Sequence, residues 1–239
     1  MSSFDEEVAD RIRDLRDNKA LKADADAFMR RSIDAGYSYN FSWMGRPIIQ
    51  YPQDMIAMQE ILWRVQPELI IETGIAHGGS LIFYASICQL IGKGEVLGID
   101  IDIRAHNRQA IESHPMATRI DMLQGSSVDP DIVAQVRARA AGKTTLVVLD
   151  SNHTHAHVLA ELRAYAPLVS VGSYCVVFDT VVEDLPPGSY PDRPWDVGDN
   201  PKTAVIAYLA ENGDFSVDQD VEAKTMITLA PGGYLYRVR

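Results

Sequence analysis

From residue 68 onward, short runs rich in aliphatic and β-branched residues alternate with stretches whose apolar side chains recur at helical spacing. The runs are predicted strands, and the stretches between them are predicted helices. Such alternation produces right-handed βαβ crossovers, and therefore a mostly parallel sheet with helices on both faces. The predicted strands are 68–74, 95–101, 119–125, 144–150 and 174–180, and the predicted helices are 79–91, 104–113, 129–140 and 155–166.

Both ends of the chain depart from this alternation. Residues 4–34 have the spacing of one or two amphipathic helices, and the aromatic segment 37–54 has the prolines and glycine of a loop. Helices are predicted at 54–65 and 201–211. The closing residues 223–238 are predicted to form two strands joined by a Pro-Gly-Gly turn. A C-terminal antiparallel hairpin on a Rossmann-like sheet is typical of class I methyltransferases rather than of simple dinucleotide-binding domains.

Size and charge exclude several classes of protein. The 239 residues, 46% of them hydrophobic, suit one large α/β domain. A net charge of −11 argues against nucleic-acid binding, which needs clustered Lys and Arg. The charged N-terminus lacks the apolar segment of a signal peptide, and no run is long enough to span a bilayer. We therefore expect a cytoplasmic protein without membrane or nucleic-acid partners.

A glycine-rich turn follows the first predicted strand and leads into a helix. Its glycines, Gly74, Gly78 and Gly79, would let the backbone approach a ligand closely, although tight packing alone also selects glycine. The spacing differs from the G-x-G-x-x-G pattern of NAD(P) sites. Asp100 ends the second strand, where a carboxylate can accept hydrogen bonds from both ribose hydroxyls. An exposed loop aspartate is the alternative interpretation of Asp100.

Carboxylates also end the fourth and fifth predicted strands, at Asp150 and Asp179. Carboxyl ends of adjacent parallel strands meet at one edge of a sheet, so these side chains are expected to lie close together and to suit Mg²⁺. Helix capping would use aspartates at the same positions. The third strand ends at Ser126 and Ser127, small polar residues that can line an adenine pocket.

Three alternate histidines, His153, His155 and His157, invite a zinc-hydrolase hypothesis. At the start of a helix, however, His153 and His157 share a face that His155 does not, and no aspartate completes a hydrolase motif. We expect instead that His153, at the edge of the sheet, acts as a general base, because imidazole titrates near neutral pH.

Several longer runs carry a family likeness, among them WMGRPIIQYPQD, LIIETGIAHGGSLIFYAS, VLGIDIDIRAHNR, VVEDLPPGSYPDRPW and the closing LAPGGYLYRV. Over residues 37–238 the chain resembles the cephalosporin hydroxylase-like family, which is grouped with rhamnosyl O-methyltransferases. The resemblance implies a class I methyltransferase fold, S-adenosylmethionine binding, usually a Mg²⁺ site, and frequently oligomers. We accordingly divide the chain into an N-terminal helical and aromatic-loop extension, 1–53, and an S-adenosylmethionine-binding domain, 54–239.

The resemblance also implies the roles of individual residues. The turn after the first strand would contact the methionine part of the cofactor, Asp100 the ribose, and Asp150 and Asp179 the metal. Together with the general-base role argued above for His153, this makes His153 and Asp179 the predicted catalytic residues. The predicted cofactor-binding residues are Glu72, Gly74, His77, Gly78, Gly79, Ser80, Asp100, Ser126, Ser127, Asp150 and Ser151.

One position departs from the family pattern. Phe178 stands where the family has a glutamate beside Asp179, and a phenyl ring cannot coordinate Mg²⁺. Either the metal site is weaker, or Glu183 or Asp184 replaces the missing ligand, or the reaction needs no metal.

The sequence therefore predicts O-methylation of a hydroxyl on a secondary metabolite or sugar, in a setting such as antibiotic biosynthesis. The aromatic residues Tyr37, Tyr39, Phe41, Trp43 and Trp195 would surround the acceptor or pack as a lid. The alternative keeps the fold and cofactor but catalyses a cyclisation or rearrangement, or assists a biosynthetic partner. The amphipathic N-terminal helices predict a homo-oligomer.

Overall fold

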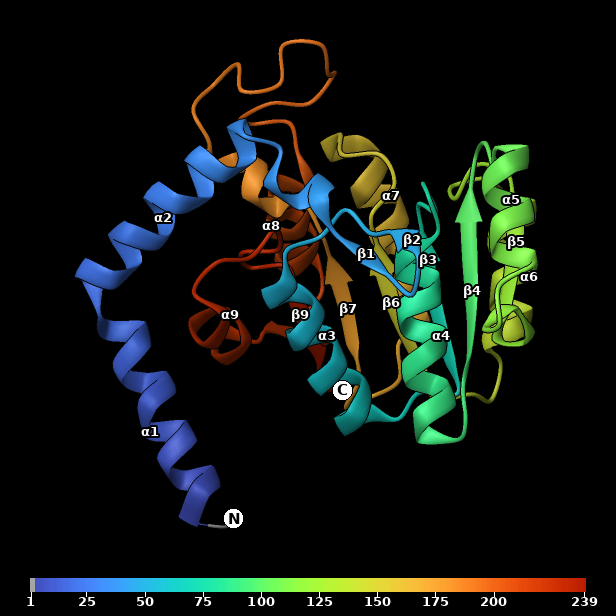
Figure 1. Ribbon diagram of the computed structural model, residues 1–239, viewed down its shortest axis with the longest axis horizontal. Helices are drawn as coiled ribbons and strands as arrows, with labels where there is room; N and C mark the ends of the chain where they lie inside the picture. The colour runs from blue at the N-terminus through green and yellow to red at the C-terminus, as the bar shows by residue number, and fades with distance from the viewer. Residues whose placement is uncertain (1–2) are drawn as a thin grey trace.

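The five strands predicted from the alternating pattern form the parallel part of a seven-stranded sheet in the computed structural model, which describes residues 3–239 (Figure 1). The strand order is β5-β4-β3-β6-β7-β9-β8, so the chain winds outward in both directions from β3. The strands are β3 (Leu69–Thr73), β4 (Glu95–Asp100), β5 (Ile120–Gln124), β6 (Thr145–Leu149), β7 (Tyr174–Val177), β8 (Phe215–Val217) and β9 (Tyr234–Arg237).

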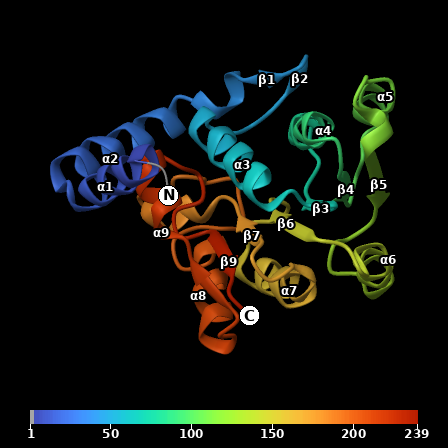
Figure 2. The ribbon, with the colours of Figure 1, turned by 90° about the horizontal axis from the view of Figure 1, so that it is seen from below.

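Helices cover both faces of this sheet, as the pattern predicted. Figure 2 shows α3 and α4 on one face and α6, α7 and α8 on the other, with α5 at the β5 edge. The two faces of β3 divide accordingly, because Ile70 packs with α3 and α4 while Leu69 and Ile71 pack on the opposite side. The helices are α3 (Pro52–Val65), α4 (Gly79–Ile91), α5 (Ala105–Glu112), α6 (Pro130–Ala140), α7 (His155–Tyr165) and α8 (Pro201–Glu211). Short 3₁₀ helices are η1 (Tyr37–Asn40), η2 (Ala117–Arg119), η3 (Ala166–Leu168) and η4 (Thr180–Asp184).

The C-terminal antiparallel pair is present, but the prediction for its first strand is wrong. β9 pairs with β7 and β8, and residues 219–225 form helix α9 (Gln219–Thr225) instead of a strand. Asp218 caps this helix by accepting hydrogen bonds from the backbone N–H groups of its first turn. The β-branched run that follows is held as a loop, because Asp54 accepts hydrogen bonds from the Leu229 N–H and the Thr228 hydroxyl. Tertiary hydrogen bonds to α3 thus outweigh the strand propensity of this run.

The N-terminal segment forms two helices, α1 (Ser3–Asp17) and α2 (Lys19–Asp34), which project from the core (Figure 1). No residue of α1 is buried, and the helix reaches α9 through an ion pair between Arg16 and Asp220. A small hairpin of β1 (Ser42–Trp43) and β2 (Arg46–Pro47) follows. Within residues 3–239, no helix has the length and apolar character needed to cross a membrane.

Candidate active site

A cavity of about 380 Å³ opens at the carboxyl ends of β3, β6 and β7. Thr73 pairs with Leu149, and Leu149 with Val177, so the residues that follow these strands emerge at one level. This register brings together residues that are far apart in the sequence. The predicted site residues that line the cavity are Gly74, His77, Gly79, Ser80, Asp150, Ser151, His153 and Asp179.

Two glycines of the turn are required by close backbone packing. A Cβ on Gly74 would lie 1.9 Å from the carbonyl oxygen of Asp150, and φ at Gly74 is +91°. A Cβ on Gly79 would lie 2.1 Å from the carbonyl oxygen of Pro47. The glycine-rich turn is therefore pressed between the end of β6 and the segment after β2. Gly78 instead packs against Ile111, outside the cavity.

Glu72 lies directly beneath the cavity and is fully buried. The Ser80 hydroxyl donates a hydrogen bond of 2.7 Å to its Oε2 atom, and the Tyr84 hydroxyl lies close to the carboxyl, although no hydrogen bond of good geometry reaches Oε1 in residues 3–239. Burial raises the pKa of Glu72 to about 8, and the nearby charge of Asp100 adds to this effect. A buried carboxylate with an unused oxygen is suited to accept a hydrogen bond from a cationic ligand.

Gln50 is a site residue that the sequence did not predict. Its side chain lines the cavity and is 2% exposed, and the buried Tyr84 hydroxyl lies close to its amide and to the Glu72 carboxyl. Neither amide atom of Gln50 has a hydrogen bond of good geometry in residues 3–239. A buried amide that faces a cavity in this way is suited to bind a polar ligand. Gln50 lies in an irregular segment after β2. Because this segment has no periodic pattern, the sequence gives no signal for its place in the cavity.

Asp150, His153 and Asp179 converge at the edge of the sheet. Each offers one ligand atom, and these atoms all lie within 4.8 Å of one another. The Nε2 atom of His153 is 3.3 Å from Oδ2 of Asp179. Burial raises the pKa of Asp150 well above its usual range, and the nearby carboxylate of Asp179 raises it further. Two carboxylates and an imidazole that face one position suit a divalent cation. The charge of the cation would offset the repulsion between the two carboxylates.

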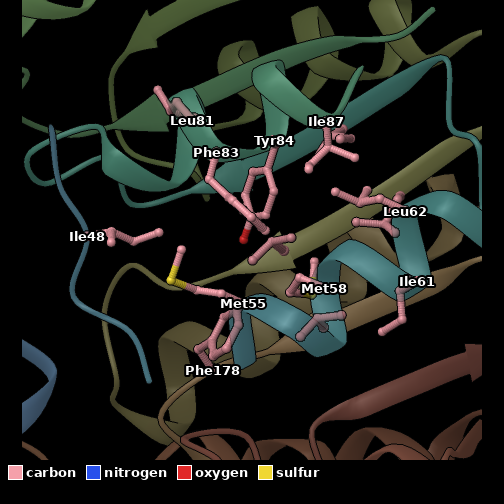
Figure 3. Close-up of a cluster of buried hydrophobic side chains, with 14 of the residues drawn as sticks. Ile48, Met55, Met58, Ile61, Leu62, Leu81, Phe83, Tyr84, Ile87 and Phe178 are labelled. Carbon is pink, nitrogen blue, oxygen red and sulfur yellow. The ribbon is translucent and has the colours of Figure 1, made fainter. Parts of the chain in front are cut away.

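Phe178 belongs to the hydrophobic core rather than to this cluster, and Figure 3 shows its ring beside Met55 of α3. Alternation along β7 directs it, with Tyr174 and Val176, to the face covered by α3 and α4, where it is 1% exposed beside Met55. Asp179, in a left-handed conformation with φ of 55°, then turns the chain so that its carboxylate reaches the cavity.

Neither carboxylate proposed as a replacement for the missing glutamate reaches the cluster. Glu183 Oε2 accepts hydrogen bonds from the Gly198 N–H, at 2.8 Å, and from the Asn200 side chain. Asp184 forms an ion pair of 2.6 Å with Lys202. The third donor at the edge of the sheet is therefore His153.

Other predicted residues do not line the cavity. Asp100 Oδ2 accepts hydrogen bonds from the N–H groups of Ile75, at 2.8 Å, and Ala76, at 3.3 Å, and so fixes the glycine-rich turn. The Ser127 hydroxyl is 3.1 Å from Nε2 of His157, and the Ser126 carbonyl accepts a hydrogen bond from the Asp129 N–H. Contacts of Asp100, Ser126 and Ser127 with the cofactor stay predictions.

The histidine run does not form a zinc site. His155 Nδ1 lies 2.8 Å from the Thr203 hydroxyl, and His157 faces Ser127 and Glu161. Of the three histidines, His153 lines the cavity.

The aromatic residues divide between the cavity and the core. Tyr39 and Trp195 line the cavity. Tyr37 packs on Phe41, with ring centroids 5.0 Å apart, and the Trp43 indole donates a hydrogen bond to the Ser86 hydroxyl. Two further lining residues, Tyr190 and Arg193, were not predicted. They lie on an irregular loop, and the sequence of such a loop does not predict which of its side chains will face a cavity.

The sheet order, the reversed strand β9 and the cavity at the strand ends define a class I methyltransferase. The family model for rhamnosyl O-methyltransferase/CmcI matches residues 35–238, and the chain belongs to this family. The family and the fold make it an S-adenosylmethionine-dependent O-methyltransferase, as the resemblance predicted.

Related sequences agree with this assignment. A rhamnosyl O-methyltransferase of Mycobacterium tuberculosis is 35% identical over 206 residues, covering 82% of this chain and 78% of its own. A rhamnosyl O-methyltransferase of Mycobacterium leprae is 34% identical, covering 82% of each chain.

Solved structures share the fold at lower identity. CmcI-D160 with Mg and SAM has a TM-score of 0.58 at 21% identity, covering 84% of this chain and 78% of its own. The O-methyltransferase TomG from Streptomyces achromogenes, in complex with SAM, has a TM-score of 0.53 at 20% identity, covering 83% and 81%.

The raised pKa of Glu72 predicts a pH-dependent stability difference from Glu72→Gln. The unfolded carboxyl loses its proton near pH 4.5 and the folded one near pH 8. As pH rises between these values, the free energy of unfolding of the wild type should fall relative to that of Glu72→Gln, by up to about 1.4 kcal/mol per pH unit. Above that window the difference should be constant. Urea titrations across this pH range measure it, and parallel stability curves would contradict the assignment.

Phe178 provides a second prediction. Phe178→Glu should lower the free energy of unfolding by about 3–5 kcal/mol, because it places an unpaired charge in the core. It should not tighten Mg²⁺ binding, because position 178 faces α3 and α4. The control Phe178→Leu should lose less than about 2 kcal/mol. Calorimetric Mg²⁺ titration together with urea unfolding tests this, and a stable Phe178→Glu protein with tighter Mg²⁺ binding would refute it.

Proposed function

We propose that the chain transfers the methyl group of S-adenosylmethionine to a hydroxyl of a sugar or secondary metabolite, with a divalent cation at Asp150 and Asp179. The observation that carries the proposal is the convergence of Asp150, His153 and Asp179 on the cavity at the strand ends. The surroundings of Asp150 within this cluster, and of the buried Glu72 carboxyl near it, raise the pKa values of both groups. Positive charge from a cofactor and an ion would lower the pKa values of both carboxyl groups.

The methionine part of the cofactor is assigned to the inner end of the cavity. Glu72 has a free oxygen for an ammonium group, and Ser80 orients this carboxylate through its own hydrogen bond. Gln50 offers an amide N–H donor to a carboxylate. Gly74 and Gly79 leave room because neither has a side chain. S-adenosylmethionine supplies an electrophilic methyl group on a sulfonium, so the protein's contribution is positioning.

The donor set at the edge of the sheet suits Mg²⁺, since this ion commonly binds through one or two carboxylates and keeps waters. A divalent cation there supplies positive charge that favours ionisation of an adjacent hydroxyl. The solved relatives CmcI-D160 and MycE were crystallised with Mg and with SAM or SAH, respectively, which supports the same pairing of ligands here.

His153 is proposed as the base that removes the hydroxyl proton. Its imidazole lines the cavity, with Nε2 close to Asp179. The Trp195 ring packs edge-on against it, with centroids 4.6 Å apart, and restricts how the imidazole can turn. An imidazole held in this position can accept a proton from a hydroxyl that lies beside the reacting methyl group.

A second candidate function keeps the cofactor without methyl transfer. Phe178 removes one carboxylate of the family pattern, which favours a cyclisation, a rearrangement or a supporting role for another biosynthetic enzyme. His153 offers a third donor in its place, and for this reason we favour methyl transfer.

Mass spectrometry of the products tests the proposal. Incubation with S-adenosylmethionine, Mg²⁺ and a panel of glycosides and phenols should give a product that gains one methyl group. Asp150→Asn and His153→Ala should lower kcat by about 100-fold or more. Asp184→Asn, which breaks a surface ion pair with Lys202, should leave kcat unchanged. Products formed without a methyl gain would favour the second function, and full activity in Asp150→Asn would contradict the metal assignment.

We also propose that the N-terminal helices form a homo-oligomer. Leu21 and Phe28 lie two turns apart on α2 and are 39% and 44% exposed, which suits contact with a second copy. Sedimentation at micromolar concentration should show more than a monomer, and the double variant Leu21→Ser, Phe28→Ser should shift it toward monomer. Leu90→Ser, at a residue 82% exposed on α4, should change nothing. A monomeric wild type would refute the proposal.

A further inference from the structure

The mouth of the cavity is formed by the loop 185–199, between η4 and α8. Figure 1 shows this orange segment extending beyond the strand ends. The loop is fixed at its base, because Asp196 accepts a hydrogen bond of 2.9 Å from the Gly188 N–H and its carbonyl accepts another of 2.9 Å from the Asn200 side chain. A loop held in this way can hold its side chains in defined positions over the cavity.

Three side chains of this loop line the cavity: Tyr190, Arg193 and Trp195. The guanidinium of Arg193 lies 5.3 Å from the centroid of the Trp195 ring, and the Arg193 N–H donates to the Tyr190 carbonyl. In the part of the chain that the structure describes, no carboxylate forms an ion pair with this guanidinium. Arg193 is therefore an exposed cation beside the Trp195 ring, and no other residue that the structure describes uses its guanidinium donors.

Trp195 lies between Arg193 and the proposed base His153. Its ring lies 4.6 Å from the His153 ring and 5.3 Å from the Arg193 guanidinium. The distance from guanidinium to imidazole cannot exceed the sum of these values. A molecule of about one ring, with a hydroxyl on one side and a second polar group on the other, would span it.

From this geometry, we propose that Arg193 binds an anionic group of the acceptor, so that the substrate is a hydroxylated ring bearing a carboxylate or a phosphate. The inference rests on the proposed function, which places the reacting hydroxyl beside His153. Guanidinium pairs with both anions through two parallel hydrogen bonds, which fixes orientation as well as adding affinity. The ring itself would lie against Trp195, Tyr190 and Tyr39.

The charge of the whole protein does not oppose this inference. The net charge of −11 repels anions at long range, but screening at physiological salt confines that repulsion to about 8 Å. At contact distance the guanidinium dominates. The carboxylates at the inner end would be offset by the cofactor and the cation.

Paired probes test the inference on the full chain loaded with S-adenosylhomocysteine and Mg²⁺. The carboxylate probe is the methyl glycoside of glucuronic acid, with its carboxylate free, and the phosphate probe is glucose 1-phosphate. Methyl glucoside is the neutral partner of both. Calorimetry or ligand-observed NMR should show at least one anionic probe bound about tenfold more tightly than methyl glucoside. The probe that gains affinity identifies the anion as carboxylate or phosphate.

Three variants assign that preference to Arg193. Arg193→Gln should reduce it to about twofold or less, and Arg193→Lys should keep part of it, because the charge remains but the planar pair of donors is lost. The control Arg137→Gln, which removes an exposed charge on α6, should leave it unchanged.

Two kinds of failure can be distinguished. The inference is overturned if methyl glucoside binds as tightly as the anions, if no anionic probe binds, or if the preference survives in Arg193→Gln. In each case the proposed function stands as long as S-adenosylhomocysteine binds to the same samples. Failure of S-adenosylhomocysteine to bind would overturn the proposed function and this inference with it.

Discussion

The backbone contact between Gly74 and Asp150 sets the geometry on which the site depends. β3 and β6 are neighbours in the sheet, and the turn after β3 passes so close to Asp150 that a Cβ at position 74 would overlap its carbonyl. This packing places the partly buried Asp150 carboxylate beside Asp179 and near Glu72, where desolvation and the neighbouring carboxylates raise its pKa. The fold thus concentrates carboxyl groups at one end of the sheet. Their desolvation and mutual repulsion destabilise the folded protein, and bound cations would offset this effect.

The direction of β7 decides which side chains take part. Strand alternation places Phe178 in the core, and the left-handed turn at Asp179 brings the next side chain into the cavity. Glu183, which the sequence offered as a replacement ligand, instead holds the base of the loop 185–199 through Gly198 and Asn200. In place of a third carboxylate, the imidazole of His153 lies with Asp150 and Asp179 at the edge of the sheet. The same loop places Arg193 and Trp195 above the reacting groups.

Strand positions and the convergence of Asp150 with Asp179 could be predicted, because both follow from alternation and from parallel register. The strand expected in 223–238 was wrong, since capping by Asp218 and hydrogen bonds to Asp54 outweigh the propensity of a β-branched run. Gln50 and Arg193 could not be found from the sequence. Each lies in an irregular segment, whose course depends on tertiary contacts rather than on any local period.

The Asp150 and Asp179 carboxylates at the strand ends are proposed to bind a divalent cation, and the rest of the proposed site depends on it. The most direct test is a calorimetric Mg²⁺ titration in two buffers of different ionisation enthalpy, at several pH values. Because the pKa of Asp150 is raised, binding should release protons and tighten as pH rises, with one ion per chain. Absence of saturable binding, or binding without proton release at any pH, would contradict the account.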